Sequence, residues 1–271
     1  MQKITDNVYV ETGFAGCNTG FITTKEGVVL IDTPQLPKDA VAWREEIAKH
    51  GKIRYLINTE PHGDHISGNC FFDGTLVTHE GTRDAILACT ADTFRERLEQ
   101  SAPDNLPLPE GLSYRPPAIT LSQRMTIYLG DHTFQLTNHP GHTPYQVAVY
   151  IPEERVVFTS DNIFHKILPH LRETVPYEWL ESLKKLQELD ADVLVPGHGT
   201  VCDKSYIPEM SAVIQEWIDV ASAAIAKGMS VEEAQETITL YARYLTEGED
   251  TTRPRQIQDL SLKRLYQVLK K

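Results

Sequence analysis

The sequence contains few cysteines, and no two of them have the spacing of a metal knuckle. Its four cysteines, Cys17, Cys70, Cys89 and Cys202, are far apart in a chain of 271 residues. This spacing argues against a disulfide framework and against a thiolate zinc site. We expect each cysteine to be a small buried hydrophobic side chain, because free cysteine is among the most frequently buried residue types.

Long apolar runs and an excess of positive charge are also lacking. No segment approaches the length of apolar sequence that spans a bilayer, and the first residues lack the apolar stretch of a signal peptide. We therefore predict a cytoplasmic protein with no membrane partner. Lys and Arg number 26 against 38 Asp and Glu, for a net charge of -12. Without a basic surface to follow phosphates, we predict no nucleic-acid partner and expect a small-molecule substrate.

The composition is that of an ordinary globular chain. Hydrophobic residues make up 41% of the sequence and charged residues 24%, which is enough apolar material for a large core. We predict a catalytic domain over residues 1–205 and a helical extension over residues 206–271 that packs on it. A homodimer interface is an alternative use of the extension.

Runs of alternating or β-branched apolar residues predict strands in two groups. The predicted strands are 7–11, 20–24, 28–31, 53–58 and 75–78 in the first group, and 125–129, 133–137, 146–151, 155–159 and 192–195 in the second. Helical periodicity predicts helices over 38–50, over 82–98, from Pro176 to Leu189, and through most of the chain after Tyr206. The proline-rich segment 101–117 is predicted to be a long loop, either a lid over the substrate or a plain surface connection.

The segment after the predicted strand 53–58 concentrates candidate metal ligands. Glu60, His62, Asp64 and His65 place two imidazoles and two carboxylates within six positions. A proline and a glycine between them favour an irregular turn, so several side chains can converge on one point, as metal ligation requires. Imidazole and carboxylate together suit zinc, iron or manganese.

Three further polar motifs follow other predicted strands. They are His139-Pro140-Gly141-His142-Thr143, Ser160-Asp161-Asn162 and Pro196-Gly197-His198-Gly199. A polar loop with ordinary surface histidines would explain any one of the four segments by itself. Their repeated position at strand ends favours one shared site, because α/β proteins place functional loops there.

These four segments, in this order, resemble the signature of the metallo-β-lactamase superfamily. The resemblance runs from about residue 7 to 200 and includes Val29-Leu30-Ile31-Asp32-Thr33. It implies an α/β (α+β) fold, a four-layer αββα sandwich of the metallo-β-lactamase type with C-terminal helices. It also implies a one- or two-metal site at one edge of the sandwich.

The resemblance further implies which side chains hold the metals. The first ion would take Glu60, His62 and His142, the second would take Asp64, His65 and His198, and Asp161 would bridge both. An aspartate at the bridging position resembles the glyoxalase II, lactonase and phosphodiesterase branches, whereas many true β-lactamases have cysteine or serine there. We expect two divalent metal ions, with zinc as the first expectation and manganese or iron as alternatives.

Glu60 departs from the family pattern, which usually has histidine at that position. With Glu60, Asp64, Asp161 and a bridging hydroxide, a site holding two divalent ions would be neutral instead of positive. The extra negative charge should weaken Lewis acidity, raise the pKa of bound water and favour harder ions such as manganese or iron(II). We expect Glu60 to ligate; the alternative is that it faces away and leaves the first site weak or empty.

The predicted chemistry is hydrolysis by a metal-bound hydroxide, acting on an ester, lactone, thioester, amide or phosphodiester bond. Asp64 is the predicted catalytic residue, because it could orient the nucleophile and pass its proton to the leaving group. Asp32 ends a predicted strand and could hydrogen-bond a ligand histidine, with helix capping as the alternative.

Two other functions remain open at this point. A non-haem iron sulfur (persulfide) dioxygenase of the same fold would use Glu60, His142 and Asp161, which offer one histidine where that class has two. The chain could also be a catalytically weak binding or regulatory protein, in which Glu60 in place of the usual histidine reflects a loss of catalysis. Against this, every other ligand type is present. The sequence indicates neither the substrate nor any β-lactamase activity.

Overall fold

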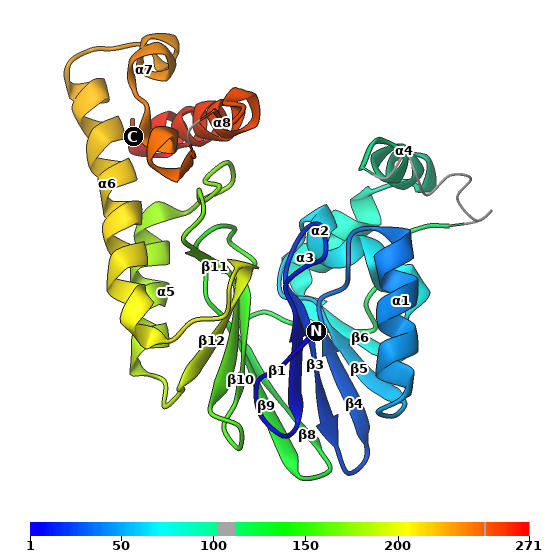
Figure 1. Cartoon of the computed structure of the whole chain (residues 1–271). Helices are drawn as coiled ribbons and strands as arrows, with labels where there is room; N and C mark the ends of the chain where they lie inside the picture. Colours follow the sequence, from blue (N-terminus) through cyan, green and yellow to red (C-terminus); the bar gives the residue numbers. More distant parts are fainter. Residues whose placement is uncertain (102–111, 247, 271) are drawn as a thin grey trace.

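The computed structural model describes residues 1–101, 112–246 and 248–270. Two sheets face each other, and helices cover the outer face of each (Figure 1). The fold is therefore the predicted four-layer αββα sandwich. In the described ranges, no helix has the length and apolar character needed to cross a membrane.

One sheet has seven strands among the described residues, arranged in chain order. They are β1 (Gln2–Lys3), β2 (Val8–Glu11), β3 (Thr19–Thr24), β4 (Gly27–Ile31), β5 (Ile53–Ile57), β6 (Thr75–His79) and β7 (Ile119–Leu121). Strands β1 to β4 pair antiparallel and β4 to β7 pair parallel. Helix α1 (Pro37–Ala48) connects β4 to β5 and lies on the outer face (Figure 1).

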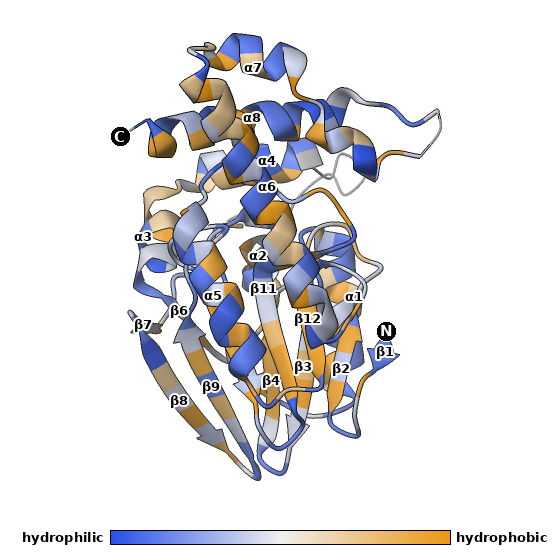
Figure 2. Cartoon of the chain, turned by 90° about the vertical axis from the view of Figure 1, so that its left-hand side faces the viewer, coloured by the Kyte–Doolittle hydropathy of each residue, from blue (hydrophilic) through white to orange (hydrophobic). Residues whose placement is uncertain are grey.

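The second sheet has five strands in the part of the chain that the structure describes. Their order is β12 (Val193–Gly199), β11 (Val156–His165), β10 (Val147–Ile151), β9 (His132–Asn138) and β8 (Arg124–Leu129). Helices α5 (Pro176–Glu188) and α6 (Ile207–Ala226) cover its outer face. Figure 2 shows apolar strands inside and hydrophilic patches along the outer side of α5.

Strand β4 shows how the alternation of a strand divides its side chains between two cores. Val29 and Ile31 lie in the core between the sheets, whereas Leu30 packs with Trp43 and Ile47 of α1. Successive side chains of a strand point to opposite faces, so a strand that is buried on both faces is a continuous apolar run. This explains why 28–31 carries no polar residue before Asp32.

The remaining helices gather at one end of the sandwich (Figure 1). They are α2 (Gly63–Ile66), α3 (Glu80–Ala88), α4 (Ala91–Ser101), α7 (Val231–Thr237) and α8 (Thr252–Leu269). The predicted single helix 82–98 is wrong, because it is two helices. Cys89 is extended, and the Thr90 hydroxyl accepts from the Thr93 backbone N–H at 3.1 Å, which caps a new helix. Most of the predicted lid, 101–117, lies outside the described residues.

Strands β11 and β12 are longer than the sequence predicts. The predicted end of β11 is Thr159, and that of β12 is Val195. The two strands remain paired in parallel as far as His165 and Gly199, with register shifts on either side of Ser160. Asp161 and His198 therefore stand on strands, not on loops after them. His198 is paired with Phe164, whereas Asp161 lies at the irregularity between Ser160 and Phe164.

The residues after 205 share a core with the second sheet. Trp217 of α6 and Leu262 of α8 lie in one apolar cluster with Trp179 and Leu183 of α5. All four side chains are at most 1% exposed. Helices α6 and α8 therefore pack against α5 on the outer side of the second sheet.

Candidate metal centre

The seven predicted ligands converge at one edge of the sandwich. They come from the segment after β5, from the loop between β9 and β10, and from β11 and β12. Their donor atoms form the groups Glu60, His62 and His142; Asp64, His65 and His198; and Glu60, His65 and Asp161, each with its atoms within 4.8 Å of one another. The structure thus brings together every side chain that the sequence predicted to be a ligand.

Asp32 holds the segment that carries the motif. Its carboxylate accepts from the Thr59 backbone N–H at 2.8 Å and from His65 Nδ1 at 2.9 Å. Asp32 has a φ of +53°, an uncommon backbone angle for a residue with a side chain. Of the two roles that the sequence leaves open for Asp32, this contact is the hydrogen bond to a candidate ligand histidine. It puts the His65 proton on Nδ1 and leaves Nε2 free to face the centre.

The first group is formed by Glu60, His62 and His142. His62 Nδ1 lies 2.8 Å from Glu60 Oε1 and 3.1 Å from His142 Nε2. All three residues are buried. Ligands at about 2.0–2.1 Å from a tetrahedral ion are separated by roughly 3.3–3.5 Å, so this spacing is close to that of one coordination sphere.

The second group is formed by Asp64, His65 and His198, with Asp161 beside it. His198 Nε2 lies 3.2 Å from Asp64 Oδ2 and 3.3 Å from Asp161 Oδ2. The other oxygen of Asp161, Oδ1, lies 3.2 Å from His65 Nε2, and Oδ2 lies 3.6 Å from His142 Nε2. Asp161 therefore stands between the two groups, which is the position of a bridging ligand.

Two buried polar atoms at the middle of this centre have no hydrogen-bond partner among the described residues. They are His65 Nε2 and Asp161 Oδ1. Buried polar atoms are nearly always paired, so two unpartnered atoms side by side need an explanation. A cation that binds an imidazole nitrogen and a carboxylate oxygen supplies one. The donor set and the unpartnered atoms both fit divalent metal ions.

Glu60 points into the centre and is clamped there by a glutamine. Its Oε1 lies 3.1 Å from His65 Nε2, and its Oε2 accepts a hydrogen bond from Gln146 Nε2 at 2.7 Å. Glu60 and Gln146 are both fully buried. Glu60 therefore faces the centre and does not point away from it.

Burial and neighbouring charge act in opposite directions on the ionisable groups of the centre. Burial raises the pKa of Glu60. Burial also disfavours the charged forms of Asp161 and Asp64, but the histidines around them hold both pKa values well below their usual range. Burial lowers the pKa of His142 to about 3. Burial disfavours the charged forms of His62 and His198, but the carboxylates beside them raise both pKa values to about 10. The ionised carboxylates of Asp64 and Asp161 thus favour positive charge at the centre, whether protons or metal cations supply it.

Small residues make room for the centre. A Cβ on Gly197 would lie 1.9 Å from Asp161 Oδ1, and a Cβ on Gly141 would lie 2.1 Å from Asn162 Oδ1. Both glycines belong to the motifs that the sequence singled out. Because these glycines have no side chain, β12 and the loop before β10 can both approach β11 closely.

Cys17 belongs to a fourth group, with Asp32 and His65, that offers metal-ligating atoms. Its atoms already have partners, because His65 Nδ1 bonds Asp32 and Cys17 Sγ donates to the Asp64 carbonyl at 3.1 Å. Burial raises the pKa of the Cys17 thiol to about 12. Cys17 is therefore a buried thiol beside the centre, as expected of a cysteine without a metal role.

The sequence did not single out two polar residues that contact the centre. Gln146 lies at the start of a predicted strand, and Glu173 lies just before a predicted helix. A glutamine at the start of an otherwise apolar buried strand is a usable signal for Gln146. Glu173 Oε1 lies 3.2 Å from His62 Nε2, and no sequence pattern predicts that pairing.

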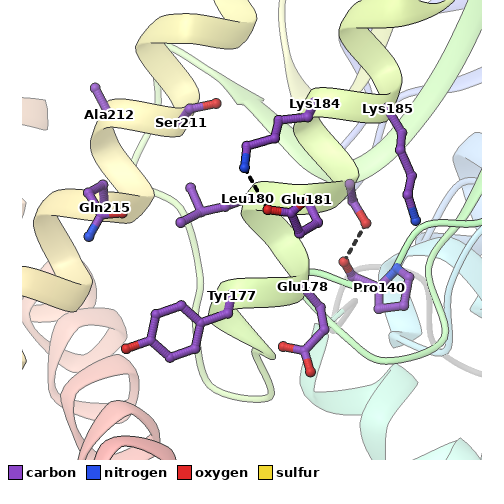
Figure 3. A pocket seen from close by; sticks show the side chains of 11 residues that line it. Pro140, Tyr177, Glu178, Leu180, Glu181, Lys184, Lys185, Ser211, Ala212 and Gln215 are labelled. Carbon is purple, nitrogen blue, oxygen red and sulfur yellow. Dashed lines mark hydrogen bonds and ion pairs between the residues drawn. The ribbon is translucent and has the colours of Figure 1, made fainter.

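A groove elsewhere on the surface contains none of the predicted ligands. It lies between α5 and α6 (Figure 3), where Lys184 pairs with Glu181 at 2.6 Å and Ser182 donates to the Pro140 carbonyl at 2.7 Å. Its charged side chains already pair with each other or face solvent. We assign this groove no catalytic role.

Comparison with known proteins agrees with this geometry. The family model described as the metallo-beta-lactamase superfamily matches residues 12–198. The chain belongs to this superfamily. A metallo-beta-lactamase type 2 from Elizabethkingia meningoseptica is 26% identical over 235 residues, covering 80% of this chain and 85% of that protein. A beta-lactamase-like protein 2 homolog from Caenorhabditis elegans is 26% identical over 70% of this chain, and the match covers 58% of that protein.

Solved structures of the superfamily share the fold. A metallo-beta-lactamase family protein from Thermus thermophilus aligns with a TM-score of 0.71 at 18% identity, over 99% of this chain and 95% of that one. A metallo-beta-lactamase from Pontibacter korlensis aligns with a TM-score of 0.62 at 22% identity, over 79% of this chain and 97% of that one. A hydroxyacylglutathione hydrolase from Bartonella quintana is 35% identical over only 74 residues, 27% of this chain and 29% of that protein. Membership of this superfamily, together with the candidate ligand clusters, supports a metallo-hydrolase at the level of the family.

Proposed function

We propose that this chain is a dinuclear metallo-hydrolase with a carboxylate in the first metal site. Glu60, His62 and His142 would hold one ion, Asp64, His65 and His198 the other, and Asp161 would lie between them. The observation that carries the proposal is the pair of unpartnered buried atoms, His65 Nε2 and Asp161 Oδ1, at the middle of seven converging ligands. When bound, the ions would supply Lewis acidity and an activated water.

The chain's own residues would orient and protect this chemistry. Asp32 keeps the His65 proton on Nδ1, so that Nε2 is available as a ligand. Asp64 is more exposed than its neighbours, with 26% of its side chain accessible, and so lies nearest to an entering substrate. We propose that Asp64 holds the proton of the attacking water and passes it to the leaving group.

We propose zinc as the first metal to test, with manganese and iron(II) as the alternatives that the extra carboxylate favours. The bond that is cleaved is an ester, lactone, thioester, amide or phosphodiester. The named relatives include a hydroxyacylglutathione hydrolase, a metallo-beta-lactamase and a linear primary-alkylsulfatase, so their names do not favour one bond.

The test is elemental analysis of the purified wild-type protein and of Glu60→Ala and Glu60→His, with Glu80→Ala as an exposed control. We expect two ions per chain in the wild type, one in Glu60→Ala and two in Glu60→His. Hydrolysis is assayed on lactones, thioesters, phosphodiesters, β-lactams and alkyl sulfates. Unchanged stoichiometry in Glu60→Ala would rule out ligation by Glu60. Oxygen uptake with a persulfide, in place of hydrolysis, would contradict the reaction class.

A further inference from the structure

The loop between β11 and α5 contacts both histidines of the proposed first site. The Glu173 carboxylate accepts from His62 Nε2 at 3.2 Å, and the carbonyl oxygen of His170 accepts from His142 Nδ1. Each bond uses the ring nitrogen that faces away from the centre. The other two nitrogens, His62 Nδ1 and His142 Nε2, are 3.1 Å apart beside Glu60.

These outer contacts determine which nitrogen can bind a metal. A neutral imidazole carries one proton, and a hydrogen bond to an outer acceptor keeps that proton on the outer nitrogen. Glu173 thus favours the Nε2–H form of His62, whose Nδ1 lone pair points at Glu60. Half of the Glu173 side chain is exposed, so replacing it opens no cavity in the core.

The same loop is fastened to the C-terminal helix on both sides of Glu173. The Leu171 backbone N–H donates to Ser261 Oγ of α8 at 3.1 Å, in a buried position. The Arg264 Nε–H of α8 donates to the Thr174 carbonyl at 3.0 Å. Figure 1 shows α8 lying at the end of the sandwich where the loops of the second sheet gather.

A further contact ties the loop to the segment that carries His142. The Thr174 hydroxyl donates to the Gly141 carbonyl at 2.9 Å, and the Val175 backbone N–H donates to the same oxygen at 2.9 Å. Movement of the loop would therefore shift Glu173 and the His142 segment together.

We propose that Glu173 is a positioning residue of the first metal site, and that α8 holds Glu173 in place through Ser261 and Arg264. This inference rests on the proposed function for the presence of the ion. It adds that the C-terminal helix supports the metal centre. Glu173 touches neither substrate nor metal in this account and acts only through His62.

The direct test compares Glu173→Ala and Glu173→Gln with the control Glu178→Ala, an exposed glutamate on α5. Zinc affinity is measured in competition with a chromophoric chelator, which resolves the two ions by their dissociation constants. We expect Glu173→Ala to lower the affinity for one of the two zinc ions by about 10–100-fold. This is the usual effect of removing the outer hydrogen-bond partner of a ligand histidine. Glu173→Gln retains most of the affinity because its amide oxygen still accepts, and Glu178→Ala changes neither constant.

A spectroscopic readout separates positioning from a merely structural role. Long-range ¹H–¹⁵N spectra of the zinc-loaded protein report the tautomer of each histidine ring. We expect His62 to be the Nε2–H form in the wild type. In Glu173→Ala the Nε2 proton of His62 exchanges faster with solvent, while the His65 signals stay unchanged because Asp32 still binds that ring.

The role of α8 is tested with Arg264→Ala and Ser261→Ala, against Lys263→Ala as the exposed neighbour on the same helix. Both variants should lower the affinity for the same zinc ion as Glu173→Ala does, by a smaller factor. The control should change neither affinity. If the wild type binds two ions and none of these variants changes either affinity, the inference is overturned while the proposed function stands. A wild type that binds only one ion, held by Asp64, His65 and His198, would contradict both.

Discussion

Glu60 and Gln146 are two polar side chains that share one buried hydrogen bond at the metal centre. The Gln146 amide donates to Glu60 Oε2, which leaves Oε1 directed at His62 and His65. A buried carboxylate needs a compensating donor or cation, and here it has a donor on one oxygen and the proposed ion on the other. The glutamate at this position is thus supported by the residues around it.

A substitution of Gln146 tests this support. Gln146→Ala removes the donor, and Gln146→Glu places a second carboxylate against Glu60. We expect the first-site affinity for zinc to fall by about 10–100-fold in Gln146→Ala and further in Gln146→Glu, because like charges repel in a buried site. The measurement is zinc competition with a chelator. The control is Gln135→Ala, an exposed glutamine on β9, and equal affinities in all four proteins would show that Gln146 does not support Glu60.

The ligand types could be predicted from the sequence because they recur in short motifs, but their hydrogen-bond partners, apart from Asp32, could not. Glu60, His62, Asp64 and His65 occupy nearby positions, so their convergence follows from the loop alone. Glu173 reaches His62 across 111 positions of sequence. Such a contact is set by how the β11–α5 loop packs, and no local pattern records it.

Strands β11 and β12 decide where two of the ligands lie. Their positions were predicted, but their ends were not, because Ser160 to Asn162 and Pro196 to Gly199 have the composition of loops. In the structure the parallel pairing continues past a register shift and brings Asp161 against Gly197. Ser160 lies between the two register shifts and has a positive φ of +52°. Tertiary pairing here overrides local propensity.

Gly197→Ala tests the close approach of the two strands. The added Cβ would meet Asp161 Oδ1 at 1.9 Å, so the carboxylate must move. We expect the variant to lose at least one of the two ions and most hydrolytic activity, as judged by elemental analysis and by the hydrolysis assays. Gly228→Ala is the matched control. It has a positive φ of 76° but no atom within 4 Å of the new Cβ, so it should lower stability slightly and keep both ions. Full metal content in Gly197→Ala would mean that Asp161 is not a ligand.

We propose that the whole molecule unfolds as one cooperative unit. The helices after residue 205 share an apolar cluster with α5 and the second sheet, and the first sheet packs on the second through another cluster. The metal ligands come from both sheets. Loss of the helical extension should therefore disturb the sheet and the centre together.

Trp217→Ala tests this coupling from a site far from the ligands in sequence. Trp217 is almost fully buried on α6, and truncation of such a side chain costs about 3–5 kcal/mol of unfolding free energy. We expect denaturant unfolding followed by circular dichroism and by metal release to give coincident transitions at lower denaturant. Tyr177→Ala, which removes an exposed aromatic side chain of α5, should stay within about 0.5 kcal/mol of the wild type. Separate transitions would show that the extension folds independently.

We expect two ions to bind this chain and Glu60 to be a ligand of one of them. Anomalous diffraction from crystals of the zinc-loaded protein, recorded at the zinc absorption edge, tests it most directly. We expect two peaks, one of them at about 2.0–2.2 Å from Glu60 Oε1, His62 Nδ1 and His142 Nε2. A single peak among Asp64, His65 and His198, with no metal density near Glu60, would contradict it.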